Sequence, residues 1–105
     1  MASAFKTGQV LSVIAVHTAP EDAGAFVKTF SEGPKASHSM PGFEGLAVAE
    51  DTREPGSFLV VSLWKDEGAL NGYVRSPGFG ADHASAGAVK SAQSQRPGRF
   101  VIRES

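Results

Sequence analysis

One segment, residues 57–64 (Ser-Phe-Leu-Val-Val-Ser-Leu-Trp), constrains the fold more than any other. It is rich in β-branched and aromatic residues and bounded by turn-forming residues, which predicts a strand. Successive side chains of a strand point to opposite faces of its sheet. The two resulting rows are both apolar: Phe58, Val60 and Trp64 on one face, and Leu59, Val61 and Leu63 on the other. This strand must therefore be covered on both sides.

Three further strands are predicted around it. Residues 9–17 form a β-branched run that is too short and too continuous for a surface helix. Residues 43–50 form another strand, and the polar stretch 51–56 is short enough for a hairpin loop. The strands at 43–50 and 57–64 are therefore antiparallel. Residues 99–103 form the last strand.

Two helical segments separate these strands. The first begins at Pro20, a favoured residue in the first turn of a helix, and ends at Gly33-Pro34. The second begins after Asp66, which can cap it, and restarts at Ser76-Pro77. The element order is β-α-β-β-α-β, which predicts an α+β, ferredoxin-like fold with one antiparallel sheet and both helices on one face.

The opposite face of that sheet has no cover of its own. An exposed apolar patch of this size exceeds what a soluble monomer usually shows. We therefore expect a homodimer in which a second copy covers the face. The alternative is a single chain whose N-terminal tail or loops cover it. We predict one domain over residues 1–105, with residues 1–8 as a flexible tail.

Composition excludes several classes of function. The net charge of -1, without a Lys/Arg cluster, argues against nucleic acid as a partner. The lack of cysteine excludes disulfides, thiolate metal sites and cysteine nucleophiles. No apolar run reaches the roughly 20 residues of a membrane span, and no Gly-x-Gly-x-x-Gly motif indicates NAD or flavin. We expect a cytoplasmic protein.

Three motifs carry a resemblance to a known family: Met40-Pro-Gly-Phe-Glu-Gly45, Trp64 at the end of its strand, and Ser76-Pro-Gly-Phe-Gly-Ala-Asp-His83. With these motifs the chain resembles the antibiotic biosynthesis monooxygenase (ABM) superfamily from Gln9 to Arg103. The resemblance implies a dimeric α/β barrel with a pocket between helices and sheet in each subunit. Some members oxygenate quinols or anthrones with dioxygen alone, and others bind haem through a helix histidine and degrade it.

The resemblance gives His83 and Tyr73 candidate catalytic roles. His83 matches the histidine that ligates haem iron in those members. The alternative is a histidine without a role in the site, hydrogen-bonded at a helix face or exposed beside the dimer interface. Tyr73 stands where haem-degrading members carry tryptophan, and its hydroxyl could bind a quinol oxygen. The asparagine of their first strand is replaced here by Val13 or Ile14, so the known scheme of haem degradation lacks a donor.

Five further residues are candidates for the pocket wall, although ordinary core packing also explains the aromatic ones: Trp64, Phe26, Phe30, Phe79 and His17. The ligand is expected to be a small planar aromatic molecule. Three functions follow. The most concrete is haem binding or oxidative haem degradation, the next is cofactor-independent oxygenation of a quinol or anthrone, and the third is a ligand-binding dimer without catalysis.

Overall fold

Strand β1 (Val10–His17) lies at the centre of one antiparallel sheet. The computed structural model describes residues 4–33, 35–86, 89 and 91–105. Along its whole length β1 pairs with β3 (Ser57–Trp64), and β2 (Phe43–Glu50) pairs with the far side of β3. The other edge of β1 is covered in two pieces, β4 (Gln93–Ser94) and β5 (Gly98–Val101).

The structure confirms the predicted strands at 43–50 and 57–64 residue for residue. The last strand is different from the prediction, which placed it at 99–103 and missed β4. Pro97 lies between the two pieces, and proline has no N–H to give to a sheet. The edge is therefore interrupted and resumes at Gly98.

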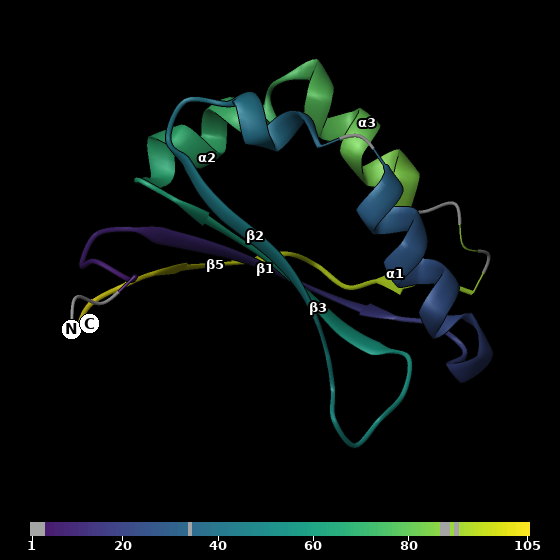
Figure 1. The fold of residues 1–105 in the computed structure, drawn as a ribbon. Coiled ribbons are helices and arrows are strands. Elements are labelled where there is room, and N and C mark those ends of the chain that lie inside the picture. The colour runs from purple at the N-terminus through teal and green to yellow at the C-terminus, as the bar shows by residue number, and fades with distance from the viewer. Residues whose placement is uncertain (1–3, 34, 87–88, 90) are drawn as a thin grey trace.

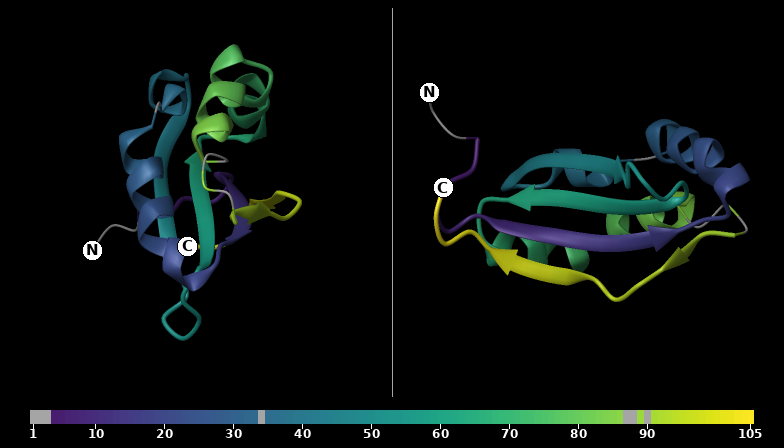
Figure 2. Two further views of the ribbon diagram at one scale, coloured as in Figure 1. Left: turned by 90° about the vertical axis from the view of Figure 1, so that its right-hand side faces the viewer. Right: turned by 90° about the horizontal axis from the view of Figure 1, so that it is seen from below.

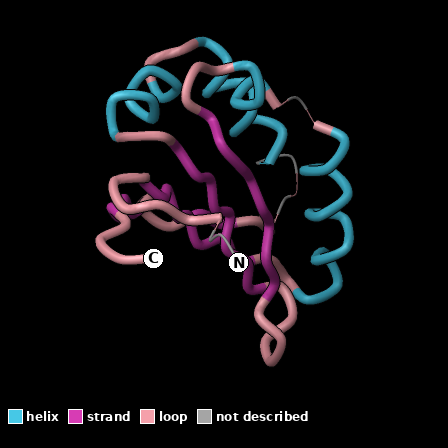
Figure 3. Tube along the Cα trace, turned by 60° about the vertical axis from the view of Figure 1, so that its left-hand side comes forward, coloured by secondary structure: helices cyan, strands magenta, loops and turns pink. Residues whose placement is uncertain are grey.

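All helices of the described chain lie on one face of this sheet (Figures 1 and 3). The predicted cap is confirmed, because the Asp66 side chain accepts a hydrogen bond from Ala69 N at 2.8 Å. The short η2, which the sequence did not predict, follows the first helix. The helical elements in chain order are η1 (Pro20–Asp22), α1 (Ala23–Glu32), η2 (Ala36–Ser39), α2 (Glu67–Val74) and α3 (Pro77–Ala86).

Two apolar clusters join the helices to the sheet. Beneath α1, Phe26 packs on Val16 and Phe58, and all three side chains are buried. Beneath α2, the cluster consists of Val10, Trp64, Leu70 and Tyr73. The α+β, ferredoxin-like fold class is thereby confirmed, and the space between the two clusters becomes the candidate site.

The other face of the sheet carries no helix of the described chain, as the view from below shows (Figure 2). Strand pairing brings three apolar pairs together on it: Leu11 with Leu63, Val13 with Val61, and Ala15 with Leu59. Leu59 is 44% exposed and Phe100 of β5 is 57% exposed. We call this set the open face. In the N-terminal segment, the Gly8 N–H donates to Ile102 O at 2.9 Å.

A search of the described helices for one long and apolar enough to cross a membrane finds none.

Candidate functional site

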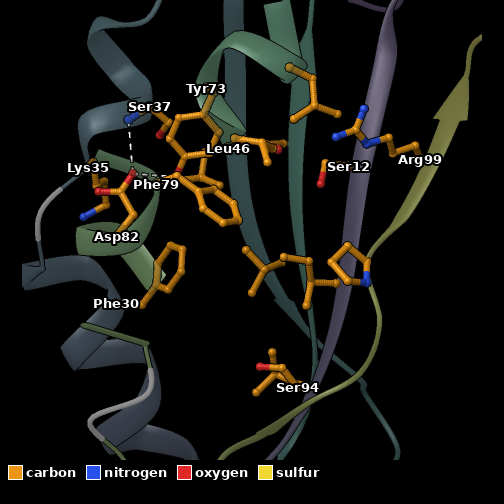
Figure 4. A pocket seen from close by; sticks show the side chains of 17 residues that line it. Ser12, Phe30, Lys35, Ser37, Leu46, Tyr73, Phe79, Asp82, Ser94 and Arg99 are labelled. Atoms are coloured by element: carbon orange, nitrogen blue, oxygen red, sulfur yellow. Dashed lines mark hydrogen bonds between the residues drawn. The ribbon is translucent and has the colours of Figure 1, made fainter. Parts of the chain in front are cut away.

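A cavity of about 270 Å³ lies between the helices and the sheet (Figure 4). Strands β1, β2 and β3 form its floor, and α1, α2, α3 and the segment around η2 form its walls. Most of the lining is apolar, as in small-molecule pockets generally. The main apolar groups are those of Ile14, Val16, Phe30, Leu46, Val60, Leu70, Val74 and Phe79.

One hydrogen-bonded group dominates the wall on the helix side. The hydroxyl of Tyr73 donates to Asp82 Oδ2 at 2.7 Å. Asp82 also accepts the backbone N–H of Ala36 at 2.8 Å and that of Ser37 at 3.1 Å. A carboxylate with three donors is strongly fixed in place. Asp82 therefore joins η2 to α3 and holds the Tyr73 hydroxyl at the cavity.

This contact requires a close approach of two helices. A Cβ atom at Gly78, in the first turn of α3, would overlap the Cβ of Ala36 in η2. Glycine at this position lets the helices come together. The Ser76-Pro77 restart begins α3 just before Gly78, and Asp82 follows on the same helix. The start of α3 at Pro77 and the glycine at position 78 thus place the Asp82 carboxylate within reach of the N–H groups of η2.

Burial raises the pKa of Tyr73 well above its ordinary value. The hydrogen bond to Asp82 and the negative charge of that carboxylate raise it further, and a hydrogen bond with Ser37 offsets part of the effect. The Tyr73 side chain is therefore a neutral phenol at any physiological pH. Because its proton points at Asp82, its oxygen can accept a hydrogen bond from a ligand.

Aromatic packing fixes the Tyr73 ring from both sides. Trp64 stacks on it, with ring centroids 5.1 Å apart and an interplanar angle of 22°. Phe79 meets it edge to face at 5.4 Å. The indole Nε1 of Trp64 donates to Ser62 Oγ at 2.9 Å, so the buried indole is satisfied. The phenol is thus held by packing as well as by Asp82.

The floor carries a polar row within its apolar surface. Cross-strand pairing places Arg99 of β5 beside Ser12 of β1, and Ser12 beside Ser62 of β3. All three line the cavity. The guanidinium of Arg99 reaches in on the side opposite Asp82 and Tyr73 (Figure 4). The cavity therefore has polar groups at two separate ends.

The predicted site residues fall into three groups. Tyr73, Phe30 and Phe79 line the cavity. Phe26 and Trp64 are fully buried in the core and are not among the lining residues, and His17 is exposed at the end of β1. His83 lies in α3, but its side chain is outside the described part of the chain.

Sequence reasoning missed the polar groups of the cavity. Asp82 directly precedes His83 in a motif that the sequence analysis singled out, but no spacing rule pairs it with Tyr73. Ser12 and Ser62 did leave a signal, because each is a small polar residue within an apolar strand face. A polar residue at such a position is a recognisable mark of a cavity.

Tyr73 offers a direct test, since it is the only tyrosine of the chain. The folded protein should show no tyrosinate absorbance at a pH near 10, where free tyrosine titrates, and should show it only on unfolding. Above about pH 10 the unfolded chain releases this proton while the folded chain keeps it. The free energy of unfolding should then fall with pH by up to about 1.4 kcal/mol per pH unit more steeply than in Tyr73→Phe. Tyrosinate absorbance that rises near pH 10 with the fold intact would contradict this.

Comparisons with known proteins give a consistent result. Residues 10–85 match the family model described as antibiotic biosynthesis monooxygenase. SnoaB, a cofactor-independent oxygenase from Streptomyces nogalater, is similar in structure with a TM-score of 0.70 and 19% identity, over 93% of this chain and 96% of that one. The chain matches no curated protein sequence.

Two further solved structures share the architecture. A protein from Deinococcus radiodurans has a TM-score of 0.73 and 20% identity, over 91% of this chain and 94% of that one. Rv0793 from Mycobacterium tuberculosis has a TM-score of 0.70 and 12% identity, over 93% and 98%. Identities this low establish a common fold, and the chemistry must be argued from the cavity.

Proposed function

Because this chain belongs to the antibiotic biosynthesis monooxygenase family, we propose that its cavity oxygenates a planar hydroxylated aromatic compound, an anthrone or a quinol, with dioxygen and no cofactor. The observation that carries this proposal is the Tyr73–Asp82 pair at the wall of an apolar cavity. The similarity to SnoaB, itself a cofactor-independent oxygenase, supports it.

The pair suits the first step of such a reaction. A ligand hydroxyl or enolisable C–H can give its proton to the Tyr73 oxygen while Tyr73 passes its own proton to Asp82. An apolar, water-poor cavity favours a delocalised ring anion over a small hydrated one. Stacked aromatic walls hold a flat ring in place. The substrate anion is then the electron source, as cofactor-free oxygenation requires.

For an anthrone, the remaining steps balance without another reagent. The carbanion passes one electron to dioxygen, and the resulting superoxide and ring radical combine into a carbon–oxygen bond. The peroxide takes back the proton held by the Tyr73–Asp82 pair. Loss of the second ring hydrogen, with cleavage of the O–O bond, leaves a carbonyl and one molecule of water. One CH₂ group and one O₂ are thus converted into one C=O and one H₂O.

Haem, the more concrete ligand in the sequence analysis, fits the described residues less well. The cavity of about 270 Å³ lies at the small end of ligand pockets, which measure about 300–1,000 Å³. It therefore suits an anthrone or a quinol better than an iron porphyrin, which is a much larger ligand. The fixed Asp82 carboxylate also occupies the wall formed by α3. The proposed reaction therefore involves no haem.

We also propose that the working unit is a homodimer whose two open faces pack together. A two-fold interface would place the apolar pairs across β1 and β3 of one copy against the same pairs of the other copy. The Leu59 and Phe100 side chains, largely exposed in one chain, would then be buried.

Oxygen consumption with a hydroxyanthrone tests the proposed function. The wild type, treated with a chelator, should consume oxygen above the rate without protein and form the quinone. Tyr73→Phe keeps the ring packing but removes the proton relay, so its kcat should fall by about 10²–10⁴-fold. Phe5→Tyr, which adds a hydroxyl at an exposed aromatic residue outside the cavity, is the control.

Each outcome of this assay is decisive. Equal activity in wild type and Tyr73→Phe would overturn the role of the pair. Binding without oxygen uptake would make the protein a ligand-binding dimer. A Soret band on addition of haem, together with bleaching under ascorbate, would favour haem degradation instead.

A further inference from the structure

We propose that Arg99, Ser12 and Ser62 form a carboxylate subsite, so that the ligand of this cavity is an acidic hydroxylated aromatic compound. The inference deepens the proposed function and rests on it for the reaction, but the subsite itself can be tested by binding alone. Its basis is the row that strand pairing builds across β5, β1 and β3.

Arg99 is held at the cavity by one of its nitrogens. Its Nη1 donates to Asn71 Oδ1 at 2.5 Å and lies 3.4 Å from Glu67 Oε2. Its Nε and Nη2 atoms have no hydrogen-bond partner among the described residues. An arginine fixed through one nitrogen keeps donors in a planar fork that matches a carboxylate.

Glu67 does not cancel this charge. Its side chain is 64% exposed, and ion pairs in such surroundings are weak. The stronger contact of Arg99 is with the neutral amide of Asn71. A ligand carboxylate that reaches Arg99 would share the guanidinium with Glu67, which contacts Nη1 alone.

The serines add donors next to the guanidinium. The Ser12 hydroxyl makes no hydrogen bond with another described residue. The Ser62 oxygen accepts the Trp64 indole N–H, which leaves its hydrogen free to be donated. Two hydroxyls beside a guanidinium can donate hydrogen bonds to an anionic oxygen of a ligand, whereas an apolar ligand surface would leave them without acceptors.

The charged residues that line the cavity carry a net positive charge. Lys35 and Arg99 are cationic, and Asp82 is the anionic lining residue. The Lys35 ammonium donates to the carbonyls of Ser31 and Gly33, and no carboxylate of a described residue pairs with it. Asp82 is engaged by Tyr73 and two backbone N–H groups. One negative charge on the ligand would balance the cavity.

The two polar ends also define the shape of the ligand. Tyr73 and Asp82 lie on the opposite side of the cavity from Arg99 and Ser12 (Figure 4). A ligand that uses both ends carries its hydroxyl and its carboxylate at opposite ends of a flat ring system.

The test compares two probes, a hydroxynaphthoate with its hydroxyl and carboxylate at opposite ends of the bicyclic ring and the matching neutral amide. Quenching of Trp64, the only tryptophan of the chain, reports binding. The wild type should bind the acid about ten-fold or more tightly than the amide, the size of a hydrogen-bonded charge contact. Arg99→Gln should remove this preference, because it should weaken binding of the acid much more than binding of the amide. Arg103→Gln, which removes an exposed charge just beyond β5, should keep it.

Equal binding of acid and amide by the wild type would overturn the subsite and leave the proposed oxygenase pocket standing. An acid preference that survives in Arg99→Gln would also overturn it. Binding of neither probe would overturn the subsite, while oxygen uptake with a hydroxyanthrone decides the oxygenase separately. An acid preference that depends on Arg99, in a protein that consumes no oxygen with any hydroxyanthrone, would support the subsite and refute the oxygenase.

Discussion

Asp82→Asn should lower the free energy of unfolding by about 2–3 kcal/mol, because a half-buried charge-assisted network loses an acceptor. The two carboxylate oxygens take three hydrogen bonds, from Tyr73, Ala36 and Ser37. An asparagine offers one oxygen, and its NH₂ group would face an N–H or O–H donor. The contact between η2 and α3 should therefore loosen, and the Tyr73 hydroxyl should lose its fixed direction.

Asp51→Asn is the matched control for this change. The Asp51 side chain also accepts a backbone N–H, that of Arg53 at 2.8 Å, but it lies exposed in the β2–β3 loop. Urea unfolding followed by Trp64 fluorescence should show a change within about 0.5 kcal/mol for the control. Equal destabilisation by the two substitutions would show that Asp82 holds no network. Oxygenase activity should fall in Asp82→Asn and not in Asp51→Asn.

The two hairpin strands and the starts of the second helical segment are the parts of the fold that the sequence predicts well. Residues 57–64 are apolar on both faces, and they form β3 between β1 and β2, whereas the cover of the second face stays a prediction. The Asp66 cap and the Ser76-Pro77 restart act within a few residues of themselves. Such features depend only on residues close in sequence, so they can be predicted without the tertiary structure.

The polar part of the site depends on contacts distant in sequence. Asp82 meets Ala36, 46 residues away, only because η2 packs on α3. Arg99 lies beside Ser12 because β5 pairs with β1 after the interruption at Pro97. Tyr73 was predicted as a site residue from the family resemblance, and its direction toward Asp82 came from the structure. Such contacts between distant residues cannot be predicted from the spacing of residues along the chain.

Val61→Asp should convert the proposed dimer into monomers or unfolded chains. Val61 pairs with Val13 on one side and Ala47 on the other, at the middle of the open face. A two-fold interface would bring two copies of the new carboxylate into one apolar layer, where unpaired charges cost several kcal/mol. The dissociation constant should rise at least about a thousand-fold, which corresponds to about 4 kcal/mol.

Gln93→Asp provides the control, because it places the same charge on an exposed residue of the short strand β4. Sedimentation at micromolar concentration should show a dimer for the wild type and for Gln93→Asp, and a smaller species for Val61→Asp. Far-ultraviolet circular dichroism separates a folded monomer from an unfolded chain. The cavity lies on the other face of the sheet, so a folded Val61→Asp monomer should still bind the hydroxynaphthoate. A wild-type monomer with an intact fold, or a Val61→Asp variant that remains dimeric, would refute the packing of the two open faces.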